Sequence, residues 1–255
     1  MSELKPRKTL FNPELRRRGI YVLPNLFTTA ALFAGFYAIV QAMQHNFEQA
    51  AVAIFIAMVL DGLDGRVARL TNTQSAFGAE YDSLSDMVSF GVAPALVIYE
   101  WALRDMGRLG WIAAFVYCAC AALRLARFNT TLEVMDKRYF QGLPSPAAAA
   151  LVAGFVWVVL DNEIVGHDVR WVALVVSLFA GISMVTNCKF SSFKDINLKK
   201  SVPFFMVAAL VLAFVLVSSY PPGVLFGLFV IYALSGYALS LWRWAHKTPS
   251  KPTAN

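Results

Sequence analysis

The chain has 255 residues, of which 58% are hydrophobic and 15% charged, and its formal net charge is +6. Soluble domains average roughly 45–50% apolar and about 25% charged residues, so this composition excludes an ordinary soluble protein and indicates an integral membrane protein. The positive charge does not indicate a nucleic-acid partner, because the basic amino-terminal stretch adjoins a membrane span and no nucleic-acid-binding fold accompanies it.

Apolar segments follow one another along most of the chain, and about eight of them are long enough to cross a bilayer as helices. Backbone groups inside a bilayer have to be hydrogen-bonded within the protein, so we expect an all-α fold. A basic segment (1–19) precedes the predicted transmembrane domain (20–243), and a short polar tail (244–255) follows it. The predicted spans are 21–42, 48–69, 83–101, 110–127, 146–161, 170–188, 202–220 and 223–242.

The basic residues are distributed unevenly between the two sides of this topology. If the amino terminus is cytoplasmic, 19 of the 22 lysines and arginines lie in cytoplasmic segments, and only Arg104, Arg108 and Arg170 lie on the other side. Cytoplasmic loops of membrane proteins carry such an excess of positive charge. The asymmetry predicts a multi-pass protein with both termini in the cytoplasm, and its basic amino-terminal segment is expected to attract anionic membrane lipids.

Four aspartates border the second and third predicted spans, where a charged side chain is costly and therefore indicates function. Asp61 and Asp64 are three residues apart at the end of one span, and Asp82 and Asp86 are four residues apart at the start of the next. Each pair therefore occupies one helical face. The link 71–81 is short enough to make the two helices antiparallel neighbours. Two divalent cations with oxygen ligands would remove the repulsion between the carboxylates and can catalyse phosphoryl displacement.

The residues next to these acids suit a phosphate-containing ligand. Gly65 removes a side chain beside Asp64, where a ligand can approach the backbone closely. Arg69 lies about two helical turns beyond Asp61, and a guanidinium group suits bidentate contact with phosphate. In a purely structural role the acids would cap helices and pair with neighbouring arginines, which accounts less well for the whole set at these spacings.

The segment that holds these residues resembles the signature of the CDP-alcohol phosphatidyltransferase family. It reads DGLDGRVAR over residues 61–69, and Gly78, Asp82 and Asp86 follow at the spacing of the signature. The resemblance implies a six-helix membrane core, here with two further helices at the carboxyl end, a CDP-linked substrate, two Mg²⁺ or Mn²⁺ ions and release of CMP. It also implies that the four aspartates bind the metals and that Asp86 is the general base. The CDP site would be lined by Asn25, Thr28, Asp64, Gly65, Ala68, Arg69 and Gly78.

Three further segments resemble the bacterial phosphatidylserine synthases of this family: 23–28 (LPNLFT), 123–129 (LRLARFN) and 140–149 (FQGLPSPAAA). This resemblance implies transfer from CDP-diacylglycerol to L-serine by a homodimer in the inner membrane of a bacterium, with a cytoplasmic active site. An amino-acid acceptor needs a cation for its carboxylate, and the candidates for the acceptor site are Arg124, Arg127 and Asn129. Each arginine is equally compatible with anchoring at the cytoplasmic membrane face. Ser145, between two prolines, indicates a turn at a helix start.

Two alternatives stay open at the level of the sequence. Another acceptor, such as glycerol 3-phosphate or inositol phosphate, would need a basic cluster, which Arg124, Arg127, Lys137 and Arg138 can supply. A membrane transporter with intramembrane carboxylates belongs to a different class, and it would carry acids near the middle of the membrane and repeated halves with broken helices. Here the acids cluster at one face and the second half has no matching pair, which favours an enzyme.

Overall fold

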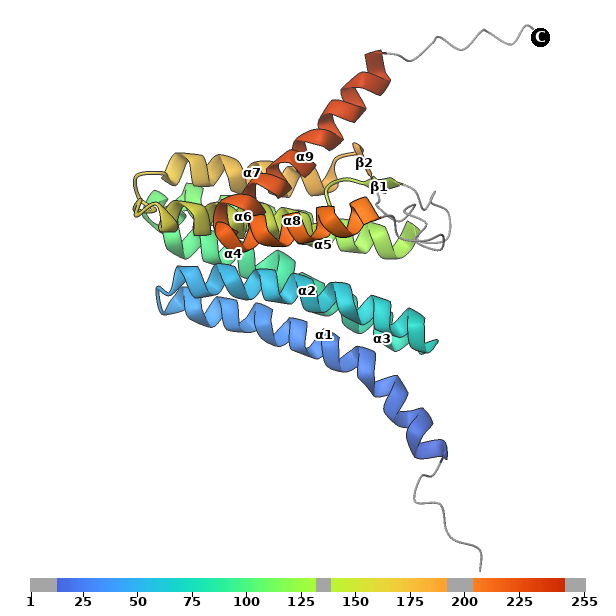
Figure 1. Ribbon diagram of the computed structural model, residues 1–255. Helices are drawn as coiled ribbons and strands as arrows, with labels where there is room; N and C mark the ends of the chain where they lie inside the picture. The colour runs from blue at the N-terminus through green and yellow to red at the C-terminus, as the bar shows by residue number, and fades with distance from the viewer. Residues whose placement is uncertain (1–12, 132–138, 192–203, 246–255) are drawn as a thin grey trace, which may run out of the picture.

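The computed structural model describes residues 13–131, 139–191 and 204–245, which form a bundle of helices (Figure 1). The first half consists of α1 (Pro13–Met43), α2 (Phe47–Thr71), a continuous helical run and α5 (Arg108–Thr131). The run contains α3 (Ala76–Asp86), η1 (Met87–Val92), α4 (Ala93–Ile98), η2 (Tyr99–Leu103) and η3 (Arg104–Met106). The second half consists of β1 (Tyr139–Gln141), α6 (Ser145–Asp161), α7 (Arg170–Val185), β2 (Lys189–Ser191), α8 (Phe204–Ser219) and α9 (Pro221–Ala245).

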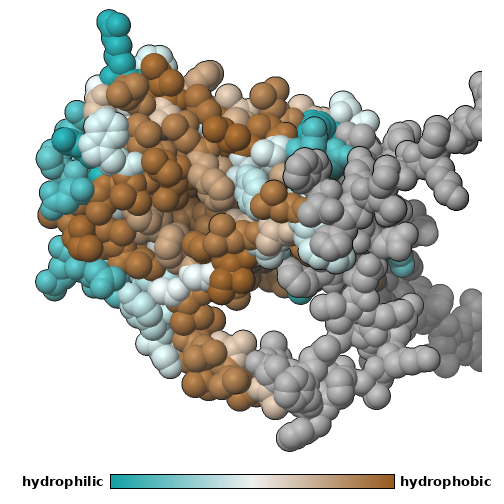
Figure 2. Space-filling view, turned by 90° about the horizontal axis from the view of Figure 1, so that it is seen from above, coloured by the Kyte–Doolittle hydropathy of each residue, from teal (hydrophilic) through white to brown (hydrophobic). Residues whose placement is uncertain are grey.

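The helices have the length and surface expected of a membrane protein. Of the helices within the described residues, four are long and apolar enough to cross a membrane, namely Leu23–Met43, Ala76–Met106, Arg108–Thr130 and Pro221–Trp242, and α6 and α7 are shorter apolar helices. Large hydrophobic side chains such as Phe33, Phe115 and Phe214 are exposed. Figure 2 shows a broad hydrophobic face that gives way to hydrophilic residues at one end. The predicted class, an all-helical integral membrane protein, is confirmed, and each predicted span coincides with a helix or with the continuous run.

The beginning of α1 and the end of α9 lie on the same side of the bundle, on the right in Figure 1. An even number of crossings produces this arrangement, as the sequence predicts. Most residues of the two predicted tails (1–12 and 246–255), together with Lys137 and Arg138, lie outside the described residues.

The turn between α2 and α3 is shorter than the sequence predicts. Within the predicted link 71–81, only the stretch from Asn72 to Ser75 is not helical. Asn72 ends α2 in the left-handed conformation with φ 52°, and its N–H bonds to carbonyl oxygens of the last turn. Ser75 caps α3, because its Oγ accepts a hydrogen bond of 3.0 Å from the N–H of Gly78. Gly78, which falls within the predicted link, therefore lies in a helix, the same one that carries Asp82.

The helix that carries Asp82 and Asp86 packs closely against α1. A Cβ atom on Gly35 of α1 would lie 2.5 Å from Ser89 Oγ and 2.6 Å from its Cα, so only a glycine permits this approach. Two serine hydroxyls one turn apart then bond to α1, Ser85 to the carbonyl oxygen of Thr28 (3.2 Å) and Ser89 to that of Ala31 (3.1 Å). Small residues and hydroxyl groups are typical of helix contacts in membranes.

α6 lies at the centre of the bundle and packs against α2, α7 and α9. At one end of it, β1 and β2 form a short antiparallel ribbon that the sequence analysis did not predict, with Phe140 opposite Phe190. Phe190 is fully buried and contacts the rings of Tyr232 and Tyr237 on α9. A Cβ on Gly236 would overlap the Phe190 ring, so this glycine makes room for it. The ribbon thereby ties α9 to the ends of α5 and α7.

Candidate functional site

Three carboxylate groups meet between α2 and α3. Asp61, Asp64 and Asp82 each offer one oxygen, and these oxygens lie within 4.8 Å of one another. Asp86, one helical turn beyond Asp82, lies close enough to Asp61 and Asp82 for the carboxylates to repel one another. The helix changes to π-helical turns at Met87, directly after Asp86, and such segments are frequent at functional sites. The structure therefore brings all four predicted aspartates together, three in one group and Asp86 beside it.

The oxygens of this cluster are only partly satisfied. Asp82 Oδ1 and Asp86 Oδ1 are buried and have no hydrogen-bond partner in the described ranges of the chain. A buried polar atom without a partner costs free energy unless a ligand supplies the interaction. Clustered carboxylates also repel one another, and hard divalent cations such as Mg²⁺ and Mn²⁺ take carboxylate oxygens as ligands. The carboxylate oxygens of the cluster are therefore suitable ligands for the divalent cations that the sequence predicts.

α1 orients one of these carboxylates. Thr28 Oγ1 donates a hydrogen bond of 2.7 Å to Asp64 Oδ2, and both residues are buried. Groups that hydrogen-bond to a metal-binding carboxylate fix its orientation. The sequence predicts that Thr28 contacts the nucleotide. In the structure its hydroxyl is engaged with Asp64, while the residue also lines the cavity beside the carboxylates.

This cavity has a volume of about 460 Å³ and lies between α1, α2 and the start of α3. Small-molecule sites fall in this size range. A Cβ on Gly65 would meet only the guanidinium nitrogens of Arg69, at 3.7 and 4.0 Å, so packing within the protein does not require a glycine there. The lining includes every residue predicted to contact CDP: Asn25, Thr28, Asp64, Gly65, Ala68, Arg69 and Gly78.

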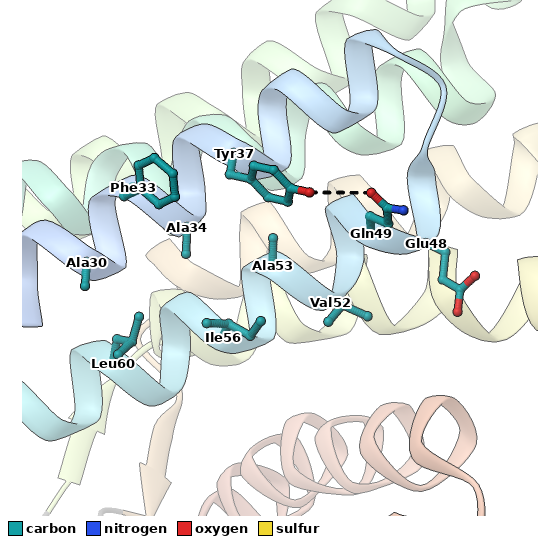
Figure 3. A pocket seen from close by; sticks show the side chains of 10 residues that line it. All are labelled: Ala30, Phe33, Ala34, Tyr37, Glu48, Gln49, Val52, Ala53, Ile56 and Leu60. Atoms are coloured by element: carbon teal, nitrogen blue, oxygen red, sulfur yellow. Dashed lines mark hydrogen bonds between the residues drawn. The ribbon is translucent and has the colours of Figure 1, made fainter.

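A second groove, of about 610 Å³, runs between α1 and α2 (Figure 3). Its lining is mostly apolar, and near one end Tyr37 bonds to Gln49 at 3.5 Å. Phe33 and Ile56 on its walls are exposed, so the groove belongs to the hydrophobic surface. It contains none of the residues predicted for the site.

The three predicted acceptor residues on α5 have different surroundings. Arg124 is buried, and its Nη1 donates a hydrogen bond of 2.8 Å to Ser145 Oγ at the start of α6. It also interacts electrostatically with Asp86. Asn129 Nδ2 donates a hydrogen bond of 3.0 Å to Ser83 Oγ, and Ser83 directly follows Asp82 of the carboxylate cluster in the chain. Arg124 and Asn129 therefore lie beside the cluster.

Arg127 has a different set of contacts. Its guanidinium donates to the carbonyl oxygens of Gln141, Val185 and Thr186 and to the side chain of Asn187, at 3.2 to 3.4 Å. These contacts join α5 to β1 and to the segment after α7. The structure thus supports a structural function for Arg127, while its predicted contact with an acceptor stays a prediction.

Sequence reasoning missed one contact of this region. Ser145 begins α6, as the sequence predicts, but it also accepts a hydrogen bond from Arg124. No local pattern in the sequence indicates this contact, because it depends on how α5 packs against the start of α6.

The fold and the carboxylate site are those expected of a membrane-embedded transferase, and comparison with known families agrees. The family model for CDP-alcohol phosphatidyltransferases matches residues 21–183, and the chain belongs to this family. The matched region includes the four aspartates and the cavity, whereas β2, α8 and α9 lie beyond it.

Several curated relatives carry the name CDP-diacylglycerol–serine O-phosphatidyltransferase. One from Helicobacter pylori is 38% identical over 218 residues, which cover 84% of this chain and 90% of the relative. One from Mycobacterium tuberculosis is 42% identical over 147 residues, or 55% of this chain and 51% of the relative. One from Saccharomyces cerevisiae is 41% identical over 141 residues, half of each chain. The chain is therefore an enzyme of this family.

Proposed function

We propose that the protein is a phosphatidylserine synthase, which transfers the phosphatidyl group of CDP-diacylglycerol to the hydroxyl of L-serine and releases CMP. The observation that carries this proposal is the carboxylate group of Asp61, Asp64 and Asp82 beside a nucleotide-sized cavity. The name and nearly equal length of the Helicobacter pylori relative support L-serine as the acceptor.

In this reaction the cavity between α1, α2 and α3 would bind the CDP group, with the acyl chains of the lipid in the bilayer. Arg69 supplies positive charge for a phosphate oxygen. Gly65 and Gly78 leave room for the ligand close to the helix backbones. Thr28 keeps the Asp64 carboxylate in a fixed orientation.

Asp61, Asp64, Asp82 and Asp86 would hold two divalent cations, Mg²⁺ or Mn²⁺. When bound, such ions neutralise charge on the attacking and leaving oxygens of a phosphoryl displacement. Asp86 is the proposed base, because it lies beside the group of three carboxylates and interacts with Arg124 on the α5 side. It accepts the hydroxyl proton of L-serine as the serine oxygen bonds to the phosphorus of the phosphatidyl group. The bond from that phosphorus to the CMP oxygen breaks, and CMP leaves.

A different acceptor within the family, glycerol 3-phosphate or inositol phosphate, would use the same carboxylates. Of the basic cluster that it would need, Lys137 and Arg138 lie outside the described residues, and Arg127 is engaged with backbone carbonyl oxygens. The membrane-transporter alternative has no remaining support, because the chain belongs to a family of transferases.

An acceptor panel tests the proposed function. Purified protein with CDP-diacylglycerol and Mg²⁺ or Mn²⁺ is given L-serine, glycerol 3-phosphate, inositol or inositol phosphate, and CMP release is followed. We expect release with L-serine alone, and loss of release when EDTA removes the metal. Release with another acceptor and not with L-serine would refute the synthase assignment. Undiminished release in EDTA would refute the metal requirement.

The same proposal includes the location and assembly of the enzyme. The charge asymmetry of the sequence supports an inner-membrane protein with cytoplasmic termini and a cytoplasmic active site. The predicted division into a membrane domain at 20–243 and two polar tails belongs to this proposal. So does a homodimer, which the family resemblance implies.

A further inference from the structure

Arg124 is a buried cation whose hydrogen bonds are incomplete. It is 9% exposed, its Nη1 donates to Ser145 Oγ, and its Nε is buried without a hydrogen-bond partner among the residues that the structure describes. A guanidinium has five N–H donors, and a buried charge is costly unless it is both paired and hydrogen-bonded. Within the described part of the chain, the Nε of Arg124 therefore lacks an acceptor, and an anionic one would suit it best.

The start of α6 adds positive potential at the same place. Ser145 is the first residue of this helix and is fully buried, and no side chain caps the helix at Pro144. The first turn of a helix carries partial positive charge and unpaired N–H groups. A guanidinium bonded to this turn is unfavourable unless an anion lies close to both.

Asp86, which lies on α3, interacts electrostatically with Arg124 on α5. In the proposed function, however, Asp86 belongs to the carboxylate cluster that binds two divalent cations. The four carboxylates carry four negative charges, which two such cations neutralise. With the cations bound, the cluster offers Arg124 no net negative charge. A substrate anion would then complete the site.

We propose that Arg124 and the Ser145 hydroxyl bind the carboxylate of an amino-acid acceptor. Ser145 Oγ accepts a hydrogen bond from Arg124, so its own O–H can donate to a carboxylate oxygen. In L-serine the hydroxyl and the carboxylate are separated by only two carbon atoms. A carboxylate held by Arg124 therefore keeps the hydroxyl close to Asp86. This subsite selects acceptors that carry a carboxylate, and it rests on the proposed function.

Steady-state CMP release at saturating CDP-diacylglycerol tests the subsite with two variants, Arg124→Met and Ser145→Ala. For Arg124→Met we expect the KM for L-serine to rise roughly 10- to 100-fold, the effect of losing a hydrogen bond to a charged group. Ser145→Ala should raise this KM by about 3- to 10-fold with kcat largely retained. L-Serinamide, which has the hydroxyl but no carboxylate, should be used equally by wild type and Arg124→Met. Equilibrium binding of CDP-diacylglycerol should not change.

The same substitution at Arg170, on the opposite side of the bundle, is the matched control and should leave every parameter unchanged. An unaltered KM for L-serine in Arg124→Met, or an equal loss with L-serine and L-serinamide, would overturn the subsite. If Arg124→Met fails to bind CDP-diacylglycerol and is misfolded, Ser145→Ala decides by the same criterion. Absence of L-serine-dependent CMP release from the wild-type protein would instead refute the proposed function itself.

Discussion

Asp86 lies beside the group of three carboxylates, and one of its oxygens is buried with no hydrogen-bond partner in the part of the chain that the structure describes. This position suits a proton acceptor better than a purely structural acid. Asp86→Asn keeps the size of the side chain but removes its basicity. We therefore expect kcat for CMP release to fall by at least about 100-fold, the usual contribution of a general base, while equilibrium binding of CDP-diacylglycerol persists.

The matched control for this variant is Asp161→Asn, which changes an exposed carboxylate at the far end of α6. It should retain full turnover. Wild-type turnover in Asp86→Asn would exclude Asp86 as the base.

Gly65 offers a second test at the scale of one residue. A Cβ there would touch only the flexible end of Arg69, so Gly65→Ala should fold normally and place a methyl group beside the cavity. We expect weaker binding of CDP, measured by calorimetry, with an unchanged or slightly higher Tm because alanine favours helix. Gly62→Ala, whose Cβ would meet nothing within 4 Å, is the control and should bind CDP normally. Equal CDP affinity in the two variants would show that Gly65 does not border the ligand.

Between elements, the contact of α1 with η1 sets the distance between Thr28 and the carboxylates. Gly35→Ala would place a Cβ 2.6 Å from the Ser89 Cα, and a backbone atom cannot move aside cheaply. Alanine gains about 1 kcal/mol of helix propensity, but overpacking costs about 1–3 kcal/mol. We therefore expect a lower Tm in detergent and reduced turnover, because displacement of α1 also loosens the Thr28–Asp64 hydrogen bond.

Gly227→Ala on α9 is the control for this prediction, because its Cβ would meet nothing within 4 Å. It should leave Tm unchanged or raise it. If Gly35→Ala were as stable as Gly227→Ala, the close approach of α1 and η1 would not be required.

The same elements show what the sequence can and cannot predict. The lengths of the apolar segments predict where the helices lie. The spacings of three and four residues place each pair of aspartates on one helical face, so the carboxylate cluster was predictable. The start of α3 was placed too late, because the capping bond of Ser75 outweighs the turn-like composition of the link. The hydrogen bonds of Thr28 to Asp64 and of Arg124 to Ser145 join residues far apart in the chain. Such contacts depend on packing, which local patterns do not contain.

At the scale of the whole molecule, the polar site lies at one end of a hydrophobic bundle. The carboxyl ends of α2 and α5 and the amino ends of α3 and α6 meet there, on the side where α1 begins and α9 ends. The lipid substrate can remain in the bilayer while a water-soluble acceptor enters from the aqueous phase at that end. Orientation of the bundle therefore decides which compartment supplies the acceptor.

The positive-inside asymmetry predicts that this end faces the cytoplasm, and cysteine labelling can test it. In a chain without Cys118, Cys120 and Cys188, one cysteine replaces Gln74 in the α2–α3 turn or Val165 in the α6–α7 turn, both exposed positions. A membrane-impermeant maleimide added to intact spheroplasts should label Val165→Cys, and should label Gln74→Cys only after the membrane is opened. The cysteine-free chain should take no label, and retained CMP release would show that each variant is folded. Labelling of Gln74→Cys in intact spheroplasts would reverse the orientation and place the acceptor supply outside the cell.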